Sequence, residues 1–140
     1  MKPETKPPIY TALAELTAWT LNRTADIPRS HRFTVGQRID GLTLDVLLLA
    51  TRALWSPPER KRPLLEDLNL QFELLRVLWR LVHDQRWISQ QQLVFVIGRI
   101  DEAGRMTGGW LRQLESKGGK CGAAPKSGSG TVPPGPKAPP

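Results

Sequence analysis

The sequence has one cysteine and two histidines in 140 residues, and these scarcities exclude whole classes of site. The lone Cys121 cannot form an internal disulfide, so nothing points to an oxidising compartment. His31 and His83 have no cysteine near them, and no Glu-x-x-His pair occurs. We therefore expect no metal site, because the usual zinc and di-metal ligand sets are missing.

Long apolar runs are also absent. No run approaches the roughly 18 residues that a bilayer-spanning helix needs, and the first ten residues, MKPETKPPIY, are polar and proline-rich, unlike a signal peptide. We expect a cytoplasmic protein that makes no membrane contact.

Catalytic motifs are missing as well. The chain has no G-x-x-x-x-G-K-[ST] phosphate-binding loop and no G-x-S-x-G elbow. Asp101 and Glu102 are adjacent, so on a helix they point about 100° apart and cannot share one task. An active site assembled from scattered residues would need a metal or cofactor that the sequence does not suggest. We predict no enzyme, no catalytic residue and no cofactor.

What the chain does have is arginine. The net charge is +7, and Met1 to Lys117 hold four lysines and thirteen arginines against thirteen acidic residues. The planar, always-charged guanidinium suits phosphate, whereas a protein that is basic only for solubility could equally use lysine. The composition favours a polyanionic partner.

Apolar residues recur at three- and four-residue steps in four segments, which are separated by short polar or proline-rich linkers. The first segment starts near Pro7, and Ser30 is a candidate N-cap for the second. Pro63 is a candidate first-turn residue for the third segment, and Ser89 a candidate N-cap for the fourth. Helices of about 20 residues joined by short turns predict an all-α, antiparallel up-down four-helix bundle over residues 1–117.

The third segment has a double apolar face. One stripe comprises Leu65, Leu68, Phe72, Leu75, Trp79 and Val82, and beside it runs a second stripe of Leu70, Leu74, Leu78 and Leu81. The second stripe is either part of a broad core face in a monomer or a surface buried between subunits. The pattern leaves both open.

Residues 118–140 change abruptly to glycine, proline, serine and lysine. Such a segment has too little apolar surface to offset the entropy lost on ordering, so it is predicted to be a disordered tail.

The fourth segment keeps Gly104, Gly108 and Gly109 within a helical pattern, although each interior glycine costs about 1 kcal/mol relative to alanine. Gly104 and Gly108 form a small-residue ridge that would admit a neighbouring helix, with Trp110 filling the adjacent groove. We expect that neighbour to belong to the same bundle or to the next subunit.

Basic residues recur at helical spacing on the third and fourth segments. Arg76, Arg80 and His83 lie at i, i+4 and i+7, and Arg105 and Arg112 are seven apart, so each set lines one strip. Arg32 and Lys117 are two further basic candidates. These residues are candidate phosphate contacts; the alternative is a solvated charged face balanced by neighbouring acids. Tryptophans near helix ends, Trp55 and Trp87, are open to either burial or base stacking.

Three stretches together resemble a known family. They are IPRSHRFTVGQRI (27–39), LLRVLWRLVHD (74–84) and EAGRMTGGWLRQLESKG (102–118). Over roughly residues 9–117 the chain is similar to the accessory variability determinant (Avd) family of diversity-generating retroelements. The wider group includes four-helix-bundle proteins encoded in bacterial rRNA intervening sequences.

The resemblance implies a bundle that assembles as a homopentamer with a basic surface. It implies binding to the retroelement's reverse transcriptase, template RNA and cDNA, in support of mutagenic cDNA synthesis. By position, the family's basic motif residues fall on Arg76, Arg80 and Arg105. The second hypothesis is a structural oligomeric bundle of the intervening-sequence type with another partner.

Overall fold

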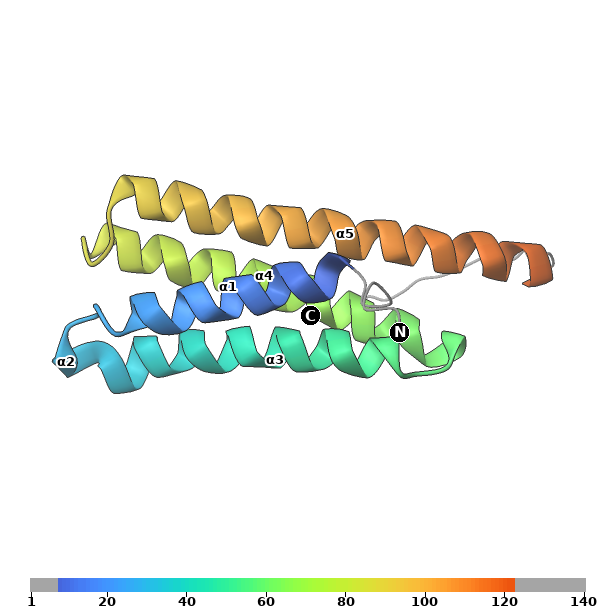
Figure 1. Cartoon of the computed structure of the whole chain (residues 1–140), viewed down its shortest axis with the longest axis horizontal. Helices are drawn as coiled ribbons and strands as arrows, with labels where there is room; N and C mark the ends of the chain where they lie inside the picture. Colours follow the sequence, from blue (N-terminus) through green and yellow to red (C-terminus); the bar gives the residue numbers. More distant parts are fainter. Residues whose placement is uncertain (1–7, 123–140) are drawn as a thin grey trace, which may run out of the picture.

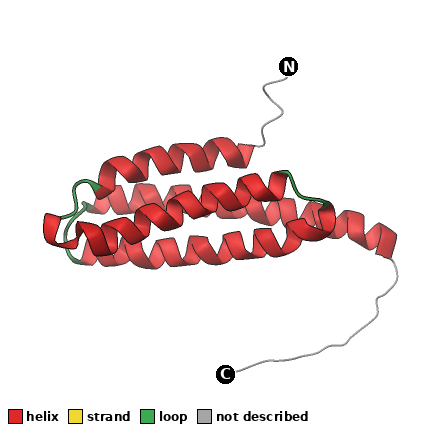
Figure 2. Cartoon of the chain, turned by 90° about the horizontal axis from the view of Figure 1, so that it is seen from below, coloured by secondary structure: helices red, strands yellow, loops and turns green. Residues whose placement is uncertain are grey.

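Four long helices lie side by side along one axis in the computed structural model of the chain (Figure 1), which describes residues 8–122, with side chains as far as Ser116. The elements are α1 (Pro8–Thr24), α2 (Arg29–His31), the π-helical turn η2 (Arg32–Gly36), α3 (Gln37–Leu54), α4 (Pro58–Asp84) and α5 (Gln90–Gly122). Within the described residues all regular structure is helical (Figure 2).

Each long helix packs against two others. The main contacts join α1 to α3, α3 to α4, α4 to α5 and α5 back to α1. Since the connections are short, successive long helices run antiparallel, as ridge-and-groove bundles do. The predicted all-α, antiparallel four-helix bundle is confirmed.

The core follows the predicted stripes. All six residues of the first α4 stripe are buried, with Trp79 and Phe72 the largest fully buried side chains. The other helices contribute Ile9, Leu13 and Leu16 from α1, Ile39 and Val46 from α3, and Val96, Ile100 and Ala103 from α5. Burying a large apolar side chain stabilises the fold by about 1.5–3 kcal/mol, so this cluster supplies the main driving force.

Two helix starts differ from the sequence expectation. The run containing α2, η2 and α3 begins after Pro28, with no side-chain cap, so Ser30 lies inside the first turn and is not the N-cap. Helix α4 begins at Pro58, whose fixed φ suits a first turn, and Pro63 lies inside it. The Pro57–Pro58 pair therefore sets the start, not Pro63.

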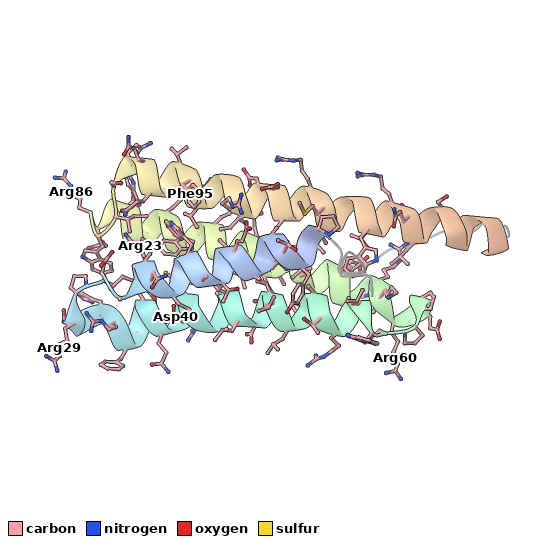
Figure 3. All side chains as sticks on the ribbon, viewed as in Figure 1. Arg23, Arg29, Asp40, Arg60, Arg86 and Phe95 are labelled. Carbon is pink, nitrogen blue, oxygen red and sulfur yellow. The ribbon has the colours of Figure 1, made fainter. Side chains whose placement is uncertain are left out.

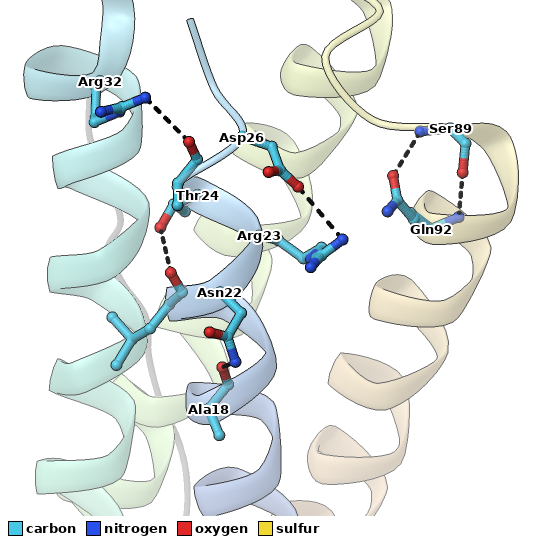
Figure 4. A network of polar contacts seen from close by, with 10 residues as sticks. Ala18, Asn22, Arg23, Thr24, Asp26, Arg32, Ser89 and Gln92 are labelled. Atoms are coloured by element: carbon cyan, nitrogen blue, oxygen red, sulfur yellow. Dashed lines mark hydrogen bonds and ion pairs between the residues drawn. The ribbon is translucent and has the colours of Figure 1, made fainter. Parts of the chain in front are cut away.

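The start of α5 is as predicted. The amide of Gln92 donates to Ser89 Oγ at 3.1 Å, and the amide of Ser89 donates to Gln92 Oε1 at 2.9 Å. This reciprocal pair is a capping box, which satisfies two amides that the helix leaves free (Figure 4).

The second apolar stripe of α4 faces outward. Leu70, Leu74 and Leu81 are exposed, Val77 joins them, and Leu78 is half-buried toward α3. Of this stripe only Leu78 packs against the core, so a broad core face within one chain does not account for the exposed Leu70, Leu74 and Leu81.

Helix α5 runs through Gly122 and extends past the other helices (Figure 1). Helical backbone thus occupies 118–122, where composition predicted disorder, and the rest of the predicted tail lies outside the described residues. No helix in the described range is long and apolar enough to cross a membrane.

Candidate nucleic-acid interface

The α4–α5 surface carries a hollow of about 680 Å³ with arginines on its walls. Helix α4 contributes Phe72, Glu73 and Arg76 among its lining residues, and α5 contributes Asp101, Arg105 and Arg112. Gly104 and Gly108 add no side chains of their own to the α5 wall. The structure therefore brings three predicted basic residues from two helices to one place.

Arg76 is already engaged within the chain. Its Nη1 donates to Glu73 Oε1 and its Nε to Asp101 Oδ1, both at 2.8 Å, and the side chain is 18% exposed. A guanidinium held by two carboxylates has little capacity left for phosphate, because a new anion would compete with both partners. Arg76 is first of all a clamp between α4 and α5.

Arg105 and Arg112 are different. Both are exposed, and neither has a carboxylate partner among the residues that the structure describes. The Arg112 guanidinium lies beside the glycines: a Cβ built on Gly108 would stand 3.6 Å from Nη1, and one on Gly109 would stand 3.8 Å from Nη2. These two side chains can turn their guanidinium groups toward an anion without breaking an ion pair.

Arg80 lies one helical turn beyond Arg76 on α4. It is exposed, has no carboxylate partner in the described part of the chain, and lies outside the residues that line the hollow. It extends the arginine surface along α4. We call Arg80, Arg105 and Arg112 the free arginine set.

Arg32 has a local structural task. Its Nη2 donates to the carbonyls of Ala25 at 3.1 Å and Ile27 at 3.3 Å, closing the connection after α1 (Figure 4). Lys117 lies on α5, but its side chain is outside the described part. Of the six predicted basic contacts, Arg32 and Arg76 are therefore occupied within the chain.

Other arginines tie helices together. Arg99 binds Glu15 of α1 and Glu102 of its own helix, and Arg62 binds Glu115 of α5 at 3.3 Å. These pairs are partly exposed, so each contributes at most about 1 kcal/mol. They show that part of the arginine excess serves the bundle itself.

The glycine ridge meets side chains and not another backbone within the chain. A Cβ on Gly104 would lie 3.5 Å from Arg76 Nη2 and 3.9 Å from Phe72 Cδ2, and Gly108 has only Arg112 nearby. The side chains over Gly104 belong to α4, and the close approach of a helix to this ridge, from the same bundle or from the next subunit, stays a prediction. Trp110 is half-buried against the core, with Lys61 Nζ 5.6 Å from its ring centroid.

Several exposed arginines without a carboxylate partner in the described residues are not among the predicted site residues: Arg29, Arg38, Arg52, Arg60 and Arg86. Arg29, Arg60 and Arg86 project from the bundle in Figure 3. The usable signal at two of them is a basic residue on each side of a tryptophan, which Arg52, Trp55 and Arg60 provide.

Titratable groups in the described part do not cluster as a metal site would require. No group of three or more histidine, cysteine, aspartate or glutamate side chains able to hold a metal ion occurs among the described residues. The charged groups that line the α4–α5 hollow are the guanidiniums of Arg76, Arg105 and Arg112 and the carboxylates of Glu73 and Asp101, both of which pair with Arg76.

Comparison with known proteins gives one family match. A family model described as bAvd-like matches residues 9–114. No curated protein and no solved structure matches the chain. Since the matched range spans the bundle from α1 to most of α5, the chain belongs to the bAvd-like family, the non-catalytic accessory proteins of diversity-generating retroelements.

Proposed function

We propose that this protein is the accessory subunit that binds the reverse transcriptase of a diversity-generating retroelement and holds its RNA and cDNA during mutagenic synthesis. Family membership implies the partnership with a reverse transcriptase. The observation that carries the nucleic-acid part is the free arginine set on the α4–α5 surface. Such side chains bind phosphates without reading bases, so binding is salt-sensitive and tolerant of sequence.

The polymerase performs the chemistry in this proposal, and the accessory subunit positions the strand. Arg105 and Arg112 each contact a phosphate from the α5 side of the hollow. Arg76 keeps the hollow in shape by fixing α4 to α5. This assigns direct phosphate contact to Arg80, Arg105 and Arg112 and a supporting role to Arg76.

The test is the salt dependence of binding to a structured RNA. We expect the triple variant Arg80→Ala/Arg105→Ala/Arg112→Ala to bind more weakly, with a slope of log affinity against log salt reduced by about 2 to 3, because each phosphate contact contributes about 0.7–0.9. Fluorescence anisotropy at several salt concentrations measures this slope.

The matched control is Arg29→Ala/Arg38→Ala/Arg86→Ala, which removes the same charge from three exposed arginines that do not line the hollow. A smaller change of slope in this control supports a defined phosphate surface. If both triple variants lose the same slope, binding follows net charge alone and the assignment to the α4–α5 surface is wrong.

The alternative is a structural oligomeric bundle of the rRNA intervening-sequence type with another partner. The intramolecular engagement of Arg32 and Arg76 favours it, since both candidates serve the fold. This alternative takes the lead if wild-type protein binds RNA no better than the Arg80/Arg105/Arg112 variant at low salt.

A further inference from the structure

Trp55 is more exposed than any other large hydrophobic side chain in the described part of the chain, at 82%. It follows α3 directly, as the C-cap residue. The other four tryptophans are buried or half-buried. Exposing a whole indole forgoes a large burial free energy, and the fold gives no reason for it.

The turn that carries Trp55 is well fixed. Lys61 Nζ donates to the carbonyls of Ala53 at 2.7 Å and Leu54 at 3.2 Å, which caps the end of α3. Ser56 Oγ donates to the Arg52 carbonyl at 2.6 Å, and two prolines follow. A ligand that stacks on this indole would therefore pay little to order the backbone beneath it.

The surroundings of Trp55 are cationic. Arg52 lies three residues earlier on α3, and Arg60 lies in the first turn of α4, from which it projects outward (Figure 3). Both are exposed and lack a carboxylate partner in the described residues. Glu59 is the only acidic residue between positions 52 and 62.

We propose that Trp55 is a stacking platform for an unpaired base of single-stranded RNA or DNA, with Arg52 and Arg60 on the flanking phosphates. Every base has a π-face, so stacking of this kind is sequence-tolerant, and neighbouring arginines follow the backbone. Paired bases inside a duplex do not offer that face, so the site selects single strands. This inference rests on the proposed nucleic-acid function and adds a second contact point, at the α3–α4 turn.

A protein partner is the competing occupant. Leu48 is exposed and lies seven residues before Trp55, so the two side chains share one face of α3. Arg52 and the polar turn at 56–60 surround the indole with charge, whereas a protein-binding stripe is expected to be mainly apolar. The charge favours the nucleic acid, and Leu48 supplies the control that separates the two occupants.

The experiment uses the full chain and three fluorescent probes: a 12-nucleotide oligo(U), a 12-nucleotide oligo(dT) and a 12-base-pair duplex. We expect Trp55→Ala to weaken single-strand binding by about 5- to 150-fold, which corresponds to one stacked base, and to leave duplex binding nearly unchanged. Trp55→Phe should retain most of the affinity. The salt slope should not change, because no charge is removed.

Leu48→Ala is the matched control, since it removes exposed apolar surface from the same face of α3 without removing a ring. A loss in Trp55→Ala confined to oligo(U) or to oligo(dT) would support the platform and identify its strand. An equal loss in Leu48→Ala would overturn it. So would an oligomer mass that falls in Trp55→Ala while single-strand affinity stays intact, because that result makes the indole a protein contact.

Two further outcomes separate this inference from the proposed function. If wild-type protein binds the probes and Trp55→Ala binds them equally well, the platform is wrong and the phosphate surface stands. If wild-type protein binds none of the probes at low salt, both are wrong. The melting temperature of Trp55→Ala should match that of the wild type, since the side chain is exposed.

Discussion

The arginines of this protein have different roles, which depend on the groups that surround each guanidinium. Arg76 meets two carboxylates and is mostly buried, whereas Arg80, one turn later, is exposed without a carboxylate partner in the described residues. The two arginines look equivalent in the sequence, because their four-residue spacing places both on one strip of the α4 surface. The neighbours that distinguish them are Glu73, three residues earlier on α4, and Asp101 on α5.

Replacing Arg76 with methionine should destabilise the bundle. Arg76→Met keeps most of the aliphatic stem but leaves Glu73 and Asp101 without their partner, so the free energy of unfolding should fall by about 1–2 kcal/mol. Urea unfolding followed by circular dichroism measures it. Arg80→Met is the control and should change stability by no more than about 0.5 kcal/mol; equal losses in the two variants would contradict the clamp.

At the scale of the element, α5 has a well-capped N-terminus and a middle of low intrinsic helix propensity. The Ser89–Gln92 capping box fixes where it begins, while Gly98, Gly104, Gly108 and Gly109 reduce its intrinsic helix propensity. Gly104 and Gly108 have no side chains that would fill the hollow, so the space beside the arginines stays open. The helix propensity of α5 is therefore low at the positions where larger side chains would fill the hollow.

Alanine should therefore stabilise α5 at Gly98, which is exposed, and at Gly108, which is half-buried. Gly98 has nothing within 4 Å of an added Cβ, and at Gly108 the nearest atom is the flexible Arg112 side chain at 3.6 Å. Gly98→Ala and Gly108→Ala should each add about 0.5–1 kcal/mol and raise the melting temperature by a few degrees. A rise in Gly98→Ala with a fall in Gly108→Ala would go against this and would indicate another subunit's helix packed on the ridge.

At the scale of the whole molecule, the bundle closes its core and still leaves an apolar stripe outside. Leu70, Leu74, Val77 and Leu81 lie along α4 on the face away from the core. Contiguous exposed apolar surface of this kind marks protein contacts. We propose that this stripe is buried between copies of the chain, in the pentamer that family resemblance implies.

Charging the stripe should break the assembly and leave the fold intact. Val77→Glu should lower the mass measured by light scattering from about five times the 15.7 kDa of one chain toward the monomer, because it would bury an unpaired carboxylate at the contact. Val94→Glu is the control on α5, since Val94 is 62% exposed and Val77 58%. An oligomer that survives Val77→Glu, or one lost equally in both variants, would rule out the α4 stripe as the contact.

The sequence by itself determined the helical class, the four long helices and most of the core, because burial along an amphipathic helix repeats with the period of the helix. It also determined the start of α5, since the Ser89–Gln92 box is built from residues three apart. Family membership was readable from three local stretches. The start of α4 was predicted at Pro63, whereas the helix begins five residues earlier at Pro58, because both prolines fit a first turn.

The tertiary structure decided which charged and aromatic groups are available. Asp101 is 25 residues from Arg76 in sequence, so no local pattern predicts that the Asp101 carboxylate accepts a hydrogen bond from the Arg76 guanidinium. Likewise Lys61 reaches back to the end of α3 and fixes the turn that displays Trp55. Periodicity reports which face of a helix is apolar, but only the packing of one helix on another determines which polar side chains find partners and which remain free to bind.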